Sequence, residues 1–147
     1  MFPWLKRDLL PVGSAAPSFI LPDEEGSVVV LYGLKGKNVV LIFYPADNTP
    51  VCTAQLCEFR DRWEALRQRG IVVYGISPQD AASHRSFRGK HGFPFPLLVD
   101  AGQRVAKLYK AEGWIVRRTV YLIGKDSVIR YAKRGKPPVE EVMAAAN

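Results

Sequence analysis

Two short apolar runs joined by a helical pattern constrain the fold of this chain more than any other feature. Residues 39–44 and 71–76 are apolar and rich in β-branched and aromatic side chains, as is typical of strands buried on both faces of a sheet. Between them, apolar residues recur every three or four positions and form one inward stripe on a helix of about 50–68: Cys52, Leu56, Phe59, Trp63 and Leu66. This order predicts a β-α-β unit with parallel strands.

The rest of the chain continues the alternation of strands and helices. We expect an N-terminal hairpin at 19–21 and 28–31, a helix at 81–91 between Asp80 and Gly92, a strand at 97–99, a helix at 103–110, a hairpin at 119–123 and 128–131, and a final helix at 138–146. This order predicts a thioredoxin-like α/β fold, in which helices flank a central mixed sheet and the first hairpin is an N-terminal extension. The chain, 1–147, has the size of a single domain.

Charge and hydropathy disfavour two classes, nucleic-acid-binding proteins and proteins that span a membrane. The formal net charge is +7, but the basic residues are spread along the chain, and their densest run, 133–136, holds only three. Neither a helix-turn-helix nor a zinc-finger spacing is present, so we expect no nucleic-acid binding; the cationic surface instead favours an acidic protein partner. No apolar stretch reaches the length that spans a membrane.

The first residues and the cysteine count bear on the compartment. Residues 1–8 lack the positive region, apolar core and cleavage site of a secretory leader, which favours a cytoplasmic protein. In that compartment, two cysteines are more often catalytic or metal-binding than part of a structural disulfide.

The two cysteines, Cys52 and Cys57, lie five residues apart in the helix that follows the first apolar run. Thr49 is placed to be the N-cap of that helix and Pro50 its first residue, so Cys52 falls in the first turn. Unpaired backbone N–H groups and the positive end of the helix dipole favour a thiolate there. The alternative is that both cysteines are inert apolar residues of the core; the turn and the spacing favour a nucleophile.

Around these cysteines the sequence resembles a known family. The pattern Pro45-x-x-x-Thr49-x-x-Cys52 resembles the active-site loop of peroxiredoxins, the thiol-dependent peroxidases. Over residues 43–61, FYPADNTPVCTAQLCEFRD, the chain is similar to the bacterioferritin-comigratory or peroxiredoxin Q branch, whose second cysteine follows the first by five positions. The resemblance extends at least to the segment 117–119, and it implies the thioredoxin-like fold.

The resemblance implies a peroxidase for hydrogen peroxide and organic hydroperoxides. Cys52 would attack the peroxide and become a sulfenic acid, and Cys57 would condense with it to give an intramolecular disulfide. Thioredoxin or a similar dithiol would then reduce that disulfide. No metal or other cofactor is implied, and the branch favours a monomer.

Three further residues are candidates for the site. The resemblance implies a guanidinium beside the reactive sulfur, and the Arg-x-Thr frame assigns it to Arg117, with Arg118 as the competing residue. Thr49 would offer its hydroxyl to the departing oxygen, together with the backbone N–H of Cys52, or would cap the helix. Pro45 would shape the loop and keep water away.

The chain departs from the branch at three positions. Val51 stands where a glycine is frequent, and Gly124 stands where an aspartate is common. Gln55 replaces a glutamate between the cysteines, which removes a charge near the thiol. These departures leave the preferred peroxide open.

Two other functions are disfavoured by the sequence. A thiol–disulfide oxidoreductase on the same fold would carry Cys-x-x-Cys, which is absent, and a proline where Arg118 stands. A metal site of Cys52, Cys57, His84 and His91 would have spacings unusual for zinc. We expect the two histidines on a solvated helix face and at its end.

Helix geometry adds an expectation about the disulfide. Five residues along a regular helix separate two Cα atoms by roughly 8.6 Å, whereas a disulfide requires less than about 7 Å. Cys52 and Cys57 therefore cannot pair in an intact helix, and we expect its first turns to unwind when they do.

Overall fold

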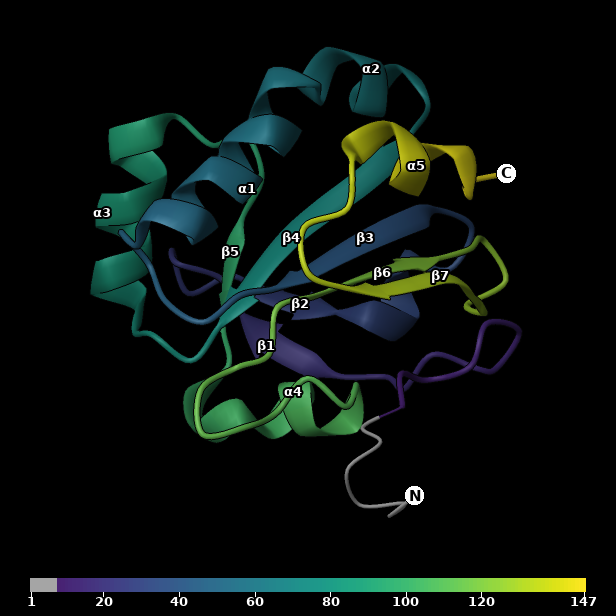
Figure 1. The fold of residues 1–147 in the computed structure, drawn as a ribbon, viewed down its shortest axis with the longest axis horizontal. Coiled ribbons are helices and arrows are strands. Elements are labelled where there is room, and N and C mark those ends of the chain that lie inside the picture. The colour runs from purple at the N-terminus through teal and green to yellow at the C-terminus, as the bar shows by residue number, and fades with distance from the viewer. Residues whose placement is uncertain (1–7) are drawn as a thin grey trace.

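The structure, a computed structural model, describes residues 8–147, so the expectation about a leader falls almost wholly outside it. Five strands form a mixed sheet in the order β5-β4-β3-β6-β7 (Figure 1). In that order, their bounds are Leu97–Val99, Ile71–Ser77, Asn38–Phe43, Thr119–Ile123 and Ile129–Arg134. β4 runs parallel to both β3 and β5, whereas β6 runs antiparallel to both β3 and β7. The predicted central mixed sheet and thioredoxin-like architecture are confirmed.

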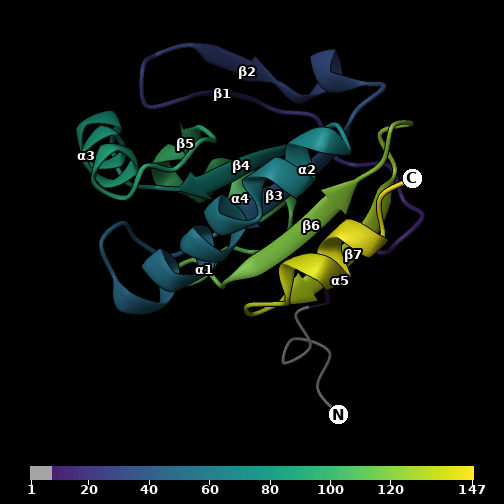
Figure 2. The same ribbon diagram turned by 90° about the horizontal axis from the view of Figure 1, so that it is seen from above.

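The strands alternate their side chains between two hydrophobic layers. In β3, Val40 and Ile42 face one layer and Val39 and Leu41 face the other, and all four are buried. Four helices cover the first layer: α1 (Pro50–Asp61), α2 (Trp63–Gln68), α3 (Ala81–His91) and α5 (Val139–Ala144). The N-terminal hairpin and α4 (Arg104–Leu108) cover the second. Figure 2 shows α1 and α5 on one side of the sheet and the hairpin on the other.

The N-terminal hairpin forms a separate two-stranded sheet. β1, Ile20–Pro22, pairs antiparallel with β2, Val28–Val30, and a 3₁₀ turn, η2 (Leu31–Leu34), follows. Asp23, in the turn of the hairpin, forms an isolated antiparallel bridge with Leu98 of β5. The predicted N-terminal extension is therefore confirmed.

The helix predicted at 50–68 is interrupted at Arg62, between α1 and α2. The amide of Arg62 is shared between the carbonyls of Glu58 and Phe59, both at 3.2 Å, which tightens the end of α1. Neither Gly nor Pro marks this position, so no residue signals the break. Phe59 and Leu66 are both fully buried, and the inward stripe continues across the break.

The last two predicted helices are shorter in the structure. A 3₁₀ turn, η3 (Ala101–Gln103), precedes α4, because Gly102 and Gln103 have positive φ of 72° and 58°, which a continuous helix does not allow. α5 occupies 139–144 of the predicted 138–146. Within residues 8–147, no helix combines the length and the apolar character needed to cross a membrane.

Close packing between β4 and β5 predicts the effect of one substitution. A Cβ on Gly75 would lie 2.7 Å from Cδ2 of the fully buried Leu97 and 3.1 Å from Cε1 of Tyr44. Gly75→Ala should therefore lower the free energy of unfolding by about 1–3 kcal/mol, measured by chemical denaturation.

The matched control is Gly89→Ala in α3, where no atom lies within 4 Å of the added Cβ. This helix substitution should stabilise the protein, by roughly 0.5–1 kcal/mol. If Gly75→Ala were as stable as the unchanged protein, the close approach of these strands would be wrong.

Candidate active site

Cys52 lies in the first turn of α1, where residues 44–49 lead the chain from the end of β3 into the helix. Thr49 occupies the N-cap position with extended backbone, φ −95° and ψ 148°, and Pro50 is the first helical residue, as predicted. The side chain of Cys52 is fully buried in the first hydrophobic layer. Its sulfur therefore combines shielding from water with the positive end of a helix dipole.

A guanidinium lies directly against this sulfur. Nη2 of Arg118 is 3.1 Å from Sγ of Cys52, and Nη1 donates to Oε1 of Gln55 at 2.9 Å. The amide of Gln55 in turn donates to the carbonyl of Gly135 at 3.3 Å, and Gln55 is fully buried. An uncharged side chain thus holds Arg118 in place, and the positive charge beside the sulfur is not neutralised by a carboxylate at position 55.

The expectation that Arg117 reaches the sulfur is wrong, since the competing residue, Arg118, makes the contact. Nε and Nη2 of Arg117 donate to the carbonyls of Glu112 and Lys110, at 3.3 and 3.2 Å. Successive side chains of an extended chain point to opposite faces of a sheet. In β6, the even-numbered Val120 and Leu122 face α1, so Arg118 shares their side and Arg117 does not.

Thr49 and Pro45 lie in the same loop, and Thr49 holds the predicted N-cap position without its side chain capping the helix. The hydroxyl of Thr49 donates to the carbonyl of Ala46 at 2.9 Å and makes no capping hydrogen bond to the helix. It would have to rotate away from Ala46 to donate to a departing oxygen. Pro45 is half-buried, and its carbonyl accepts a long hydrogen bond of 3.5 Å from Ser77. Catalytic roles for both residues stay predictions.

Cys57 lies on the same helix, partly exposed, at the margin of the first layer. Both cysteines are free thiols, and α1 is continuous from Pro50 to Asp61. The thiol form therefore holds both sulfurs in one intact helix, as expected. The pairing of the cysteines, and the unwinding that it requires, stay predictions.

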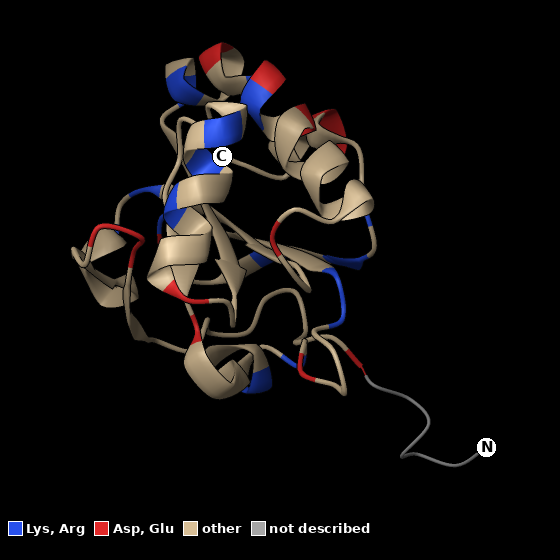
Figure 3. Ribbon diagram, turned by 90° about the vertical axis from the view of Figure 1, so that its left-hand side faces the viewer, with Lys and Arg blue, Asp and Glu red and all other residues tan. Residues whose placement is uncertain are grey.

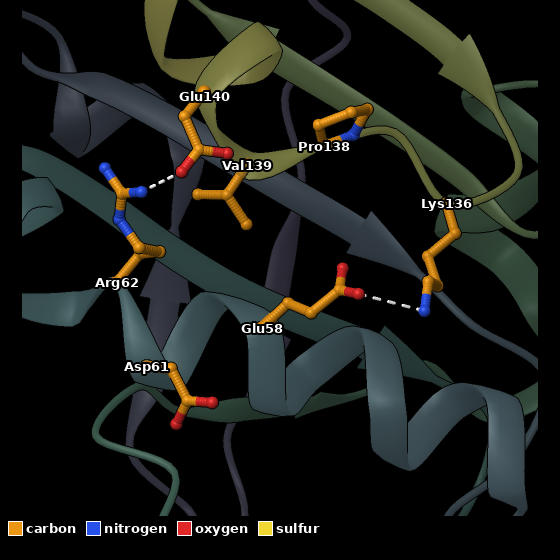
Figure 4. A pocket seen from close by; sticks show the side chains of 7 residues that line it. All are labelled: Glu58, Asp61, Arg62, Lys136, Pro138, Val139 and Glu140. Atoms are coloured by element: carbon orange, nitrogen blue, oxygen red, sulfur yellow. Dashed lines mark hydrogen bonds and ion pairs between the residues drawn. The ribbon is translucent and has the colours of Figure 1, made fainter.

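The outer face of α1 borders a cleft of about 380 Å³ beside the segment that leads into α5 (Figure 4). Lys136 and Glu58 form an ion pair at 3.0 Å, and Arg62 pairs with Glu140. Partly exposed pairs of this kind contribute little to stability. They join α1 to α5 and to the segment before it.

Figure 3 shows a mixed charge pattern on the side of the molecule that includes α3. Along α3 the charged segments are basic, whereas acidic and basic segments both occur elsewhere on this side.

The buried histidine is the largest correction that the structure makes to the sequence predictions. His84, expected on a solvated face, is fully buried in α3, and His91 at the end of that helix is half-buried. Nδ1 of His84 lies 2.6 Å from Oδ2 of Asp47, and Nε2 lies 3.0 Å from the carbonyl oxygen of Leu98. Its spacing to Phe87 is the signal that could have revealed it, because residues three apart share a helix face.

Asp47, which sequence reasoning did not single out, anchors the loop before α1. The hydroxyls of Tyr44 and Ser83 donate to its two carboxylate oxygens, at 2.6 and 2.7 Å. Burial alone would raise the pKa of Asp47, but the hydrogen bonds from His84, Tyr44 and Ser83 outweigh it and lower that pKa. Burial, and then the neighbouring carboxylate, raise the pKa of Tyr44 well above its ordinary value. At neutral pH the loop is therefore held by an ionised carboxylate and a neutral phenol.

Comparison with known sequences matches residues 12–132 to the AhpC/TSA family. The putative peroxiredoxin bcp of Coxiella burnetii is 42% identical over 131 residues, which cover 82% of this chain and 85% of that protein. The chloroplastic peroxiredoxin Q of Oryza sativa subsp. japonica is 46% identical over 123 residues, which cover 81% of this chain. The chain spans only 57% of the length of that plant relative.

Solved structures agree with the sequence relatives. Peroxidoxin BcpB from Mycobacterium tuberculosis superimposes with a TM-score of 0.86 at 28% identity, over 92% of this chain and 96% of that one. A cysteine-to-serine variant of PrxQ from Xylella fastidiosa gives 0.84 at 26% identity, over 93% of both chains. From the extent of these matches, the chain belongs to the AhpC/TSA family, in its peroxiredoxin Q or bacterioferritin-comigratory branch.

Proposed function

We propose that this protein is a thiol-dependent peroxidase that reduces hydrogen peroxide and organic hydroperoxides. The observation that carries the proposal is the guanidinium of Arg118 at 3.1 Å from the buried sulfur of Cys52, at the start of a helix. A cation and a helix N-terminus both favour the thiolate, which is the nucleophilic form of cysteine. Membership of the peroxiredoxin family supports the same reaction.

In the first step, the thiolate of Cys52 attacks one peroxide oxygen, so that an S–O bond forms as the O–O bond breaks. The second oxygen leaves with the electron pair of the broken bond and takes up a proton, which yields water or an alcohol. Arg118 and the backbone N–H of Cys52 are placed to stabilise the charge that develops on the departing oxygen. Cys52 is left as a sulfenic acid.

In the second step, the thiolate of Cys57 attacks the sulfenic sulfur, and the oxygen leaves as water after protonation. The product is a disulfide within the chain, which a dithiol such as thioredoxin reduces by exchange. The segment between the cysteines is held by contacts that its unwinding would strain, among them the bonds of Gln55 with Gly135 and Arg118 and the ion pair of Glu58 with Lys136. We also propose that the protein acts as a cytoplasmic monomer and uses no cofactor.

A metal-binding function has less support. Among residues 8–147, no three His, Cys, Asp or Glu side chains are grouped so that they could share a metal ion. The ring nitrogens of His84 instead face Asp47 and Leu98. The hydrogen-bond pattern around that histidine therefore favours a structural or positioning role.

The test of the function compares substitutions of the two adjacent arginines. The unchanged protein should consume peroxide in the presence of thioredoxin and its reductase, and Cys52→Ser should not. Arg118→Met should lower the second-order rate constant with peroxide by about 10²–10³-fold, because a donor to the developing charge is lost. Stopped-flow measurement of the first turnover checks this.

Arg117→Met is the matched control, since the Arg117 guanidinium donates to the carbonyls of Lys110 and Glu112 and not to the sulfur of Cys52. It should react within about threefold of the unchanged protein. A larger loss from Arg117→Met than from Arg118→Met would contradict the assignment.

The neutral Gln55 gives a second prediction. Gln55→Glu should slow the first turnover by about tenfold, because a carboxylate against Arg118 neutralises its charge and also repels the thiolate. Glu58→Gln, on the next turn of the same helix, is the control for a general change in charge and should leave this rate unchanged. Equal rates for Gln55→Glu and the unchanged protein would show that the charge at position 55 is not felt at the sulfur.

The separation of the cysteines predicts a change in α1. Oxidation to the Cys52–Cys57 disulfide should remove the protection of amides 53–58 from hydrogen exchange, because the intact helix keeps the two Cα atoms roughly 8.6 Å apart. Cys57→Ser treated with one equivalent of peroxide forms the sulfenic acid without a disulfide and should keep that protection. Unchanged protection in protein with a verified disulfide would refute the argument.

A further inference from the structure

The loop that leads into α1 rests on a buried hydrogen-bond network centred on Asp47. Its carboxylate accepts hydrogen bonds from Tyr44 at 2.6 Å, from Ser83 at 2.7 Å and from His84 at 2.6 Å. The amide of Asp47 donates to Oε1 of Gln79 at 2.9 Å. The network therefore joins the loop to α3 and to the segment before it. The chemistry proposed for Cys52 uses none of these groups.

His84 extends the network to a third element, β5, through the carbonyl of Leu98. A backbone carbonyl can only accept a hydrogen bond, and so can an ionised carboxylate. A ring with one proton could donate to Leu98 or to Asp47 but not to both. At the other ring nitrogen, the nitrogen lone pair would then face an oxygen lone pair. Both bonds are satisfied only when each ring nitrogen carries a proton. The ring is then an imidazolium paired with Asp47, and both side chains are completely shielded from solvent.

A buried ion pair often stabilises a fold no more than apolar residues of similar volume would. The charged pair instead fixes the orientation of the groups that it bonds. The bonds from His84 fix the Asp47 carboxylate relative to α3 and to β5 at once, and the loop leads from there to Thr49 and Cys52. Arg118 approaches the sulfur from a different element, beside β6, so the 3.1 Å contact depends on how the loop is seated on the sheet. A misplacement of about 1 Å in an active site can cost about 10²-fold in rate.

We propose that His84, doubly protonated between Asp47 and Leu98, is a positioning residue for the peroxide reaction: it acts through Asp47 to seat the loop that sets Cys52 against Arg118. This inference rests on the proposed peroxidase function. His84 does not touch the peroxide, and it acts only through the Asp47 carboxylate.

The two bonds of the ring can be separated by two substitutions. The amide nitrogen of an asparagine reaches about as far as Nδ1 of histidine, and that of a glutamine about as far as Nε2. His84→Asn therefore keeps the donor to Asp47 and loses the donor to Leu98, whereas His84→Gln does the reverse. Asparagine is the smaller residue and leaves the larger cavity, so stability alone predicts that His84→Asn is the more damaged variant.

Positioning through Asp47 predicts the opposite order of activities. His84→Gln should lower the first-turnover rate constant with peroxide at least tenfold, and His84→Asn should stay within about threefold of the unchanged protein. At alkaline pH, where Cys52 is a thiolate even without Arg118, its alkylation by iodoacetamide needs only an accessible sulfur, so in His84→Gln it should be unchanged or faster. Equal peroxide rates in all three proteins, or a loss that follows the measured stabilities, would overturn the inference.

A measurement on the unchanged protein keeps the test independent of how the variants fold. Nitrogen-15 NMR at neutral pH should detect protons on both ring nitrogens of His84, each slow to exchange with water because the ring is buried. A ring with a single proton would refute the proposed ion pair. Failure of the unchanged protein to consume peroxide would instead refute the peroxidase function, which the NMR result does not test.

Discussion

The contact between the guanidinium of Arg118 and the sulfur of Cys52 is the interaction on which the rest of the site depends. It joins the first turn of α1 to the residue before β6, and these meet because β6 pairs with β3, the strand that leads into α1. Central placement of β3 in the sheet therefore brings Cys52 and Arg118 together. Other residues hold the two partners in place. Gln55 binds the guanidinium of Arg118, and the hydrogen bonds of Asp47 hold the loop that leads to Cys52.

Most of the fold could be predicted from the spacing of apolar residues, because buried strands are continuous apolar runs and helices repeat an apolar residue every three or four positions. The break at Arg62 could not, since neither glycine nor proline stands there, whereas Gly102 marks the break before α4. The alternation of side chains along β6 could have identified Arg118 instead of Arg117, because the even-numbered Val120 and Leu122 are buried on the side of α1. The role of His84 could not be predicted, because its partner Asp47 lies 37 residues away in the sequence. The spacing of His84 to Phe87 could have indicated that it is buried, but nothing local indicates which residue it pairs with.

The start of α1 combines two opposing requirements. It must hold Cys52 in place, and it must unwind if Cys57 is to reach the sulfur. Its local sequence favours unwinding: Thr49 makes no side-chain cap, the first turn has no acidic residue, and Val51 and Thr53 are β-branched. Its tertiary contacts favour the helix, through the buried Leu56 and the bonds of Gln55. The helix is thus kept by its surroundings more than by its own propensity, which agrees with the proposal that it unwinds when the cysteines pair.

The interruption at Arg62 sets a limit on that opening. In an unbroken helix of residues 50–68 each turn lost from the start would leave the amides of the next turn without their acceptors, so that unwinding could spread along the whole helix. Here the ladder tightens at Arg62, and α2 begins anew with the bond from the amide of Leu66 to the carbonyl of Arg62. Leu66, fully buried, fastens α2 to the core independently of α1. If the first turns of α1 unwind, the hydrogen bonds and buried side chain of α2 therefore do not have to be lost with them.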